Sequence, residues 1–213
     1  MRYVVASLLT CVAIAPASAA SRREVTASFP LEGATEVVIE MEVGELTIET
    51  ADVEQVDVAL DIRCRTSSVT CERRMEQVEA VESRRDDRLQ VTVSGIGKTT
   101  SHRMEVDARV RLPRRLELVV DMGVGELDIS GVERDLFVDM GIGEVRLRLD
   151  AAAVGSVYLD AGIGESALYS GSDVEPRSSR PFLVGSELAW AEGAGNSEVV
   201  VDLGIGEISV HLD

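Results

Sequence analysis

One nine-residue phrase, repeated along the chain, constrains the fold more than any other feature of this sequence. From the copy at Asp121, the phrase returns after 18 residues, then after 21, and then after 42. Because 42 is twice 21, we expect a worn copy at "PFLVGSELAW", which starts at Pro181. A period near 20 residues is typical of a solenoid in which each coil is one repeat. The copies are "EMEVGELTI" at Glu40, "DMGVGELDI" at Asp121, "DMGIGEVRL" at Asp139, "DAGIGESAL" at Asp160 and "DLGIGEISV" at Asp202.

The apolar residues of each copy change phase partway through. In the copy at Asp121, Val120, Met122 and Val124 share one parity, whereas Leu127 and Ile129 share the other. Side chains alternate between the two faces of a strand, so both sets are predicted to point inward only if the strand switches phase between them. Such a switch needs an extra residue or a bend, for which glycine supplies the backbone freedom. The phrase is therefore predicted to be strand, corner, strand, with corner glycines at Gly44, Gly125, Gly143, Gly164 and Gly206.

Two arrangements of these corners are open. Stacked coils would place the corners over one another, whereas hairpins around "GVGE" would give an antiparallel sandwich. The near-constant period and the repeated inward apolar set favour stacking. We therefore predict an all-β, single-domain β-solenoid or β-helix-like stack over residues 21–213, with coils of about 20 residues. Residues 116–213 would carry the regular repeats, and residues 21–115 would form irregular N-terminal strands and one helix.

The first half of the mature chain fits the repeat less well. Strand-like alternation occurs in "REVTASFPL", "TEVVIEMEVGELTIET", "QVDVALDIRC", "RLQVTVSG" and "MEVDARVRLP". Between the third and fourth of these, Met75, Val78 and Val81 fall near one helical face, which predicts one short helix near residues 71–84. The segment "SGIGKTTSH" resembles the phrase but breaks its parity, and we predict a loop there.

The N-terminal segment has the features of an export signal. "MRYVVASLLTCVAIAPASAA" combines one basic residue, an apolar stretch and small residues around "ASA", which indicates a signal peptide over residues 1–20. No second apolar run approaches the roughly 20 residues of a membrane-spanning helix, so no transmembrane segment is expected after cleavage. The protein is predicted to be periplasmic or secreted. Lipidation of Cys11 is the alternative to cleavage after Ala19 or Ala20.

Two cysteines, Cys64 and Cys71, remain after this processing. An oxidising compartment favours a local disulfide between them over a pair of unlinked thiols. A metal site is less favoured, because no other cysteine and no nearby histidine completes a ligand set.

The chain is strongly acidic, with a formal net charge of −17. Such a field disfavours binding to nucleic acid and to anionic membrane surfaces. No catalytic motif accompanies the acidity, and the two histidines, His102 and His211, lie far apart with no obvious partner set. We therefore expect no enzymatic activity, no catalytic residues and no organic cofactor.

Calcium is the one ligand that the repeat itself suggests. If successive coils stack, Asp121, Asp139 and Asp160 form an outward column at the ~4.8 Å spacing of neighbouring strands. Glu126, Glu144 and Glu165 would form a second column beside it, and calcium would relieve the repulsion through oxygen ligation. The alternative is that these carboxylates are solvated or bond to backbone N–H groups at the corner.

The order of several segments resembles a known family. "SFPLEG", "VVIEMEVGELTIE", "DDRLQVTVSG" and "VRLPRRLELVVDMGVGELDISGV", followed by further glycine corners, are similar to the putative adhesin domain family of bacterial envelope proteins. The resemblance covers most of the mature chain and implies a β-solenoid or β-helix-like fold on exported or membrane-anchored proteins, without a catalytic signature. It implies a non-enzymatic binding or scaffold module with an envelope or extracellular partner. The alternatives are a calcium-binding acidic repeat protein and a self-assembling structural protein of the envelope.

Overall fold

The structure is a computed structural model that describes residues 21–66, 68–96, 104–171, 185–191 and 193–213. The expected signal peptide, His102 and the first four residues of the expected worn copy lie outside these ranges. The described residues form an all-β protein with one short helix. The elements are β1 (Arg22–Pro30), β2 (Glu36–Ala51), β3 (Gln55–Cys64), α1 (Val69–Met75), β4 (Glu79–Arg85), β5 (Arg88–Ser94), β6 (Met104–Pro113), β7 (Glu117–Ser130), β8 (Leu136–Leu149), β9 (Val154–Ser170), β10 (Ser186–Trp190) and β11 (Ser197–Leu212).

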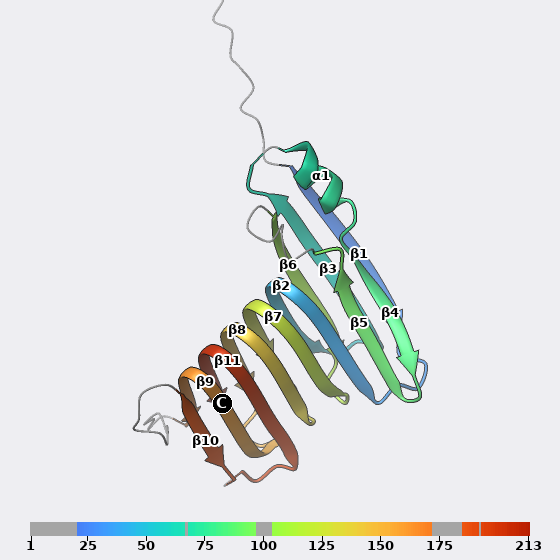
Figure 1. Cartoon of the computed structure of the whole chain (residues 1–213). Helices are drawn as coiled ribbons and strands as arrows, with labels where there is room; N and C mark the ends of the chain where they lie inside the picture. The colour runs from blue at the N-terminus through green and yellow to red at the C-terminus, as the bar shows by residue number, and fades with distance from the viewer. Residues whose placement is uncertain (1–20, 67, 97–103, 172–184, 192) are drawn as a thin grey trace, which may run out of the picture.

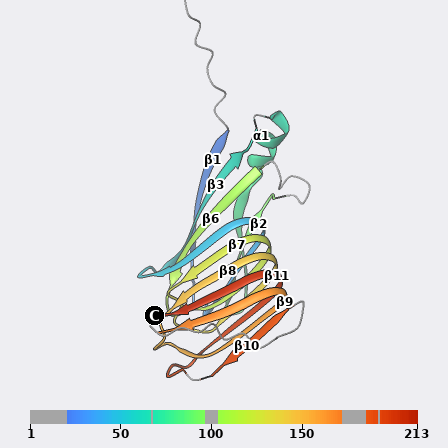
Figure 2. The ribbon, with the colours of Figure 1, turned by 90° about the vertical axis from the view of Figure 1, so that its left-hand side faces the viewer.

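The repeated phrases are long strands that bend at glycine and pair in parallel. In β2, β7, β8, β11 and β9, phrase residues lie opposite phrase residues: Gly125 pairs with Gly44 and with Gly143, and Gly206 pairs with Gly143 and with Gly164. The bends line up one beside the next in Figure 1, and Figure 2 shows the same strands side by side. The hairpin alternative is therefore wrong for these phrases, because the phrase strands run parallel.

The strands are not stacked in sequence order. β11 lies between β8 and β9, so the spatial order is β2, β7, β8, β11, β9. The expected stacking of the Asp160 copy on the Asp139 copy is wrong, because the copy at Asp202 separates them. The expected worn copy also departs from the repeat, since β10 pairs antiparallel with the first half of β9. Its Gly185 precedes β10 and is not paired with a corner glycine.

Each bend divides the single sheet into two arms that enclose the core. β4 and β5 extend the arm that precedes the corners, because β5 pairs with residues 36–41 of β2. β6, β3 and β1 extend the other arm, because β6 pairs with residues 45–51 of β2. Met41 pairs with Val93 and Glu45 with Asp107, so the pairing of β2 passes from β5 to β6 at the corner of β2. The predicted loop "SGIGKTTSH" begins at Ser94, and its residues 97–102 lie outside the described part.

The short helix ends earlier than its sequence pattern predicts. α1 stops at Met75, where the Arg23 guanidinium donates hydrogen bonds of 2.8 Å to the carbonyls of Met75 and Val78. Residues 79–84 of the predicted helix lie in β4, which pairs antiparallel with β5 across a turn whose Asp86 has a φ of 55°. The interpretation of Val81 as a helix-face residue is wrong, since it lies on this exposed strand and is 39% exposed.

Candidate functional site

In the four copies of the phrase that have two glycines, the residue between them points out of the molecule at the bend. Val124, Ile142, Ile205 and Ile163 are 42%, 47%, 43% and 48% exposed. The prediction that Val124 faces inward is wrong, because the corner takes up four residues between the buried Met122 and the buried Leu127. These side chains align with half-buried Val43 in register and form one apolar row. We call it the corner ridge: Val43, Val124, Ile142, Ile205 and Ile163, in spatial order.

In the β8 copy of the phrase, both glycines are required by the approach of the neighbouring strand. Gly143 has a φ of +149°, and a Cβ there would lie 1.8 Å from the backbone oxygen of Gly125. A Cβ at Gly141 would lie 2.6 Å from the backbone oxygen of Gly123. A side chain at either position would therefore separate the strands and break the alignment of the ridge.

Two rows of carboxylates border the ridge, one on each arm. Among the predicted carboxylates, Asp121 lies beside Asp139 and Glu126 beside Glu144, whereas Asp160 and Glu165 lie beyond the β11 copy. The copies of the phrase in β2 and β11 are evident in the sequence, but their carboxylates are not among the predicted calcium ligands. The Asp row is Glu40, Asp121, Asp139, Asp202 and Asp160, and the Glu row is Glu45, Glu126, Glu144, Glu207 and Glu165.

The Asp row is a line of mutually repelling charges. Partial burial, followed by the charges of Asp139 and Glu40, raises the pKa of Asp121. Partial burial, followed by the charges of Asp160 and Asp139, raises the pKa of Asp202. No ion pair links the four aspartates to any lysine, arginine or histidine among the residues that the structure describes.

The Glu row is partly neutralised by one arginine. Arg146 contacts Glu126 at 3.2 Å and Asp128 at 3.4 Å, and it also pairs with Glu144. Within the described ranges, Glu207 and Glu165 form no ion pair. The end of the row on β11 and β9 is therefore less compensated than its middle.

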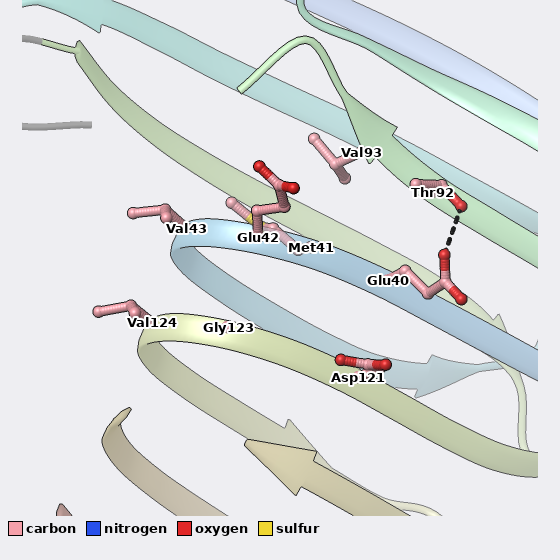
Figure 3. A pocket seen from close by; sticks show the side chains of 9 residues that line it. All are labelled: Glu40, Met41, Glu42, Val43, Thr92, Val93, Asp121, Gly123 and Val124. Carbon is pink, nitrogen blue, oxygen red and sulfur yellow. Dashed lines mark hydrogen bonds between the residues drawn. The ribbon is translucent and has the colours of Figure 1, made fainter. Parts of the chain in front are cut away.

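A hollow of about 700 Å³ lies at the β2 end of the ridge. Figure 3 shows its lining, in which Val43 and Val124 project from the bends, and Thr92 Oγ1 donates a 3.0 Å hydrogen bond to Glu40. The hollow thus combines aliphatic and acidic walls. Its full lining is Glu40, Met41, Glu42, Val43, Thr92, Val93, Asp121, Gly123 and Val124.

Metal binding is not supported by convergent geometry. Among the described residues, no three His, Cys, Asp or Glu side chains gather closely enough to hold a metal ion. The carboxylates of each row stand side by side along the stack, and calcium binding stays a prediction.

The two cysteines and His211 make contacts that hold the fold together. Cys64 and Cys71 are joined in a disulfide with Cα atoms 6.1 Å apart, which ties α1 to the end of β3. His211 lies on the outer face of β11, where its ring stacks on Tyr169 with ring centroids 4.5 Å apart. None of the helices in the described ranges has the length and apolar character needed to cross a bilayer.

Comparisons with known proteins identify the fold and no more. No family model matches the chain, and no curated protein matches it. A protein described as a putative cell adhesion protein from Clostridium sporogenes ATCC 15579 is 15% identical, with a TM-score of 0.57 over 91% of this chain and 100% of that chain. A putative lipid binding protein from Parabacteroides distasonis ATCC 8503 is 12% identical, with a TM-score of 0.37 over 88% of this chain and 61% of that one. A putative adhesin from Parabacteroides merdae ATCC 43184 is 8% identical, with a TM-score of 0.32 over 88% of this chain and 77% of that one. The chain therefore shares its fold with the first of these proteins.

Proposed function

We propose that this protein is a non-enzymatic, adhesin-like binding module of the bacterial cell envelope, of β-solenoid type and periplasmic or secreted. The corner ridge is the observation that carries the proposal. A row of exposed aliphatic side chains lowers the solubility of a protein unless a partner covers it, and contiguous exposed apolar surface marks interaction sites. The fold shared with a protein described as a cell adhesion protein supports the same reading.

The rigidity of the ridge also supports a binding role. Its residues lie on strands paired on both sides, apart from the two ends of the row, and not on a loop. A surface fixed in this way loses little conformational entropy when a partner binds. The stack would thus serve as a preorganised platform.

The experiment has two readouts. The full chain, carrying a C-terminal tag, is expressed in a Gram-negative host, and the mature N-terminus is read by mass spectrometry in the periplasm and medium. The purified mature protein is then tested for binding to envelope fractions, with Ile142→Ser/Ile205→Ser as the ridge variant and Val69→Ser, at an exposed aliphatic on α1, as the matched control. We expect binding that the ridge variant loses and the control retains. Retention of the protein in the cytoplasm, or equal binding by all three proteins, would contradict the proposal.

Cation binding by the Asp row is a second candidate, favoured by its four aspartates, which form no ion pair within the described ranges. Calcium would be taken up between neighbouring carboxylates and would lower their mutual repulsion. Titration calorimetry at millimolar calcium should then show heat that Asp139→Asn reduces. No heat and no thermal shift would remove this candidate.

A further inference from the structure

We propose that the corner ridge, with the carboxylate rows on its two sides, binds a basic amphipathic helix of a partner protein. The inference rests on the proposed binding function and specifies the chemistry of the partner. It follows from the order of the rows across the surface, which is acidic, aliphatic, acidic. A helix with an apolar stripe bordered on both sides by lysine or arginine presents the complementary order.

The spacing along the ridge suits a helix. Neighbouring strands lie about 4.8 Å apart, so the ridge rises in steps of about 4.8 Å and spans about 19 Å. Apolar residues on one helix face recur about every 5.4 Å, once per turn. Three to four turns of helix, or about 13 residues, would therefore cover the ridge with nearly matched steps.

The uncompensated charges locate the preferred end of the site. The four aspartates have no described cationic partner, and Arg146 already occupies Glu126 and Glu144. Basic side chains should therefore favour the β11 and β9 end, around Asp202, Glu207 and Glu165. There the carboxylates of both rows, on either side of Ile205 and Ile163, form no ion pair with any residue that the structure describes.

The same charges argue against other occupants. An anionic membrane surface would meet the acidic rows with like charge. A second copy of this chain, docked ridge to ridge, would bring two sets of acidic rows together. Each of these occupants is an outcome that the experiment below can detect.

The probe is an 18-residue amphipathic peptide of leucine and lysine. Its leucines recur at i, i+3, i+4 and i+7 so that they share one helix face, and lysine fills the other positions. Its affinity for the mature protein is measured by calorimetry at 50 mM and 300 mM salt. A scrambled peptide of the same composition, whose leucines share no face, separates amphipathic recognition from charge alone. Light scattering and anionic vesicle flotation accompany the titration.

The protein variants divide the site into its apolar and charged parts. Ile205→Ser/Ile163→Ser removes two ridge side chains, with Val69→Ser as the apolar control. Asp202→Asn removes one charge of the Asp row, with Glu54→Gln, in the exposed turn before β3, as the charge control. The ridge positions are exposed, so the variants should keep the wild-type melting temperature within a few degrees.

We expect the ridge variant to raise the Kd at least tenfold and Asp202→Asn to raise it at least threefold, with both controls unchanged. The scrambled peptide should bind at least tenfold more weakly than the amphipathic one. The inference is overturned if the peptide does not bind at 50 mM salt, or if wild type and ridge variant bind it equally. Flotation with vesicles, or a dimer that the ridge variant abolishes, would also overturn it by identifying another occupant.

Failure of the helix-binding inference and failure of the proposed envelope function give different results. Ridge-dependent binding to envelope fractions without peptide binding would refute the helix and leave the binding module standing. Peptide binding that depends on the ridge, without envelope binding, would support the helix-binding surface and count against the envelope role.

Discussion

Neutralising the central aspartate of the Asp row should stabilise the protein. Asp139 lies between Asp121 and Asp202, in register with both. Two unit charges at the ~4.8 Å strand spacing repel by about 0.9 kcal/mol in water, and salt at 0.1 M reduces this to about 0.5 kcal/mol. Because Asp139→Asn removes two such pairs and keeps the side-chain shape, the free energy of unfolding should rise by about 1 kcal/mol.

The raised pKa values also predict how the stability of the folded state changes with pH. The folded-state pKa values of Asp121 and Asp202 are raised, so the folded state binds protons more tightly than the unfolded state at these sites. Their contribution to stability therefore grows as the pH falls through the raised values toward the ordinary aspartate value, where the unfolded chain is protonated too. Asp139→Asn should flatten that part of the profile, because it removes one cause of both shifts.

The assay is denaturant unfolding of wild type, Asp139→Asn and the control Glu54→Gln. The gain should be largest at pH 7 and low salt, and it should vanish near pH 3 and in 1 M salt. The control should stay within about 0.5 kcal/mol of wild type, as surface changes usually do. A variant that is no more stable than wild type, or a gain that survives 1 M salt, would refute the reasoning.

Three further predictions concern the free energy of unfolding and use the same denaturant assay. Gly143→Ala should lower it by at least about 3 kcal/mol, because the added Cβ would lie 1.8 Å from a backbone oxygen. The control Gly33→Ala should lower it by only about 1 kcal/mol, because its Cβ has nothing within 4 Å and only the positive φ is strained. Equal losses would contradict the corner packing. Asp61→Asn should lower the free energy of unfolding by about 1–2 kcal/mol at pH 7, because hydrogen bonds from two arginines stabilise the Asp61 carboxylate and lower its pKa. This stabilisation should disappear as the pH falls through the lowered pKa. A loss that persists in acid would refute the prediction. Removing the disulfide with Cys64→Ser/Cys71→Ser should cost about 2 kcal/mol, since the closed loop is short, with a sequence separation of 7; reduction of the wild type should reproduce the loss.

The sequence predicts the corners because their cause is local. The change of parity between Met122 and Leu127, with glycine between them, requires a bend whatever the rest of the chain does. The repetition of that bend predicts matching strands, and matching strands pair in register when their apolar faces coincide. Both consequences are present in the structure.

The spatial order of the strands is not local and could not be predicted in the same way. The copies in β8, β9 and β11 are nearly identical at the corner, so the phrase itself does not specify which copies become neighbours. The sequence predicts too long a helix because Val81 fits a helical face as well as a strand, and the tertiary pairing of β4 with β5 decides between them.

The alternation of apolar residues does not predict the corner ridge, because it assigns the residue between the glycines to the inward face. Val124 continues the inward series of Val120 and Met122 in the sequence, but the bend turns it outward. The available signal was the pair of flanking glycines, which begins the corner before Val124 and not after it.

Cysteine cross-linking across the ridge tests the order and register of the corners most directly. Ile142 is in register with Ile205, and Ile205 with Ile163. The Cα atoms of Ile142→Cys/Ile205→Cys should therefore lie about 4.8 Å apart, within disulfide range, whereas those of Ile142→Cys/Ile163→Cys should lie about 9.6 Å apart, beyond it. Mild oxidation, read by mass spectrometry, should link the first pair and leave the second pair reduced. A link in the second pair and none in the first would show that the copies stack in sequence order and would contradict this account.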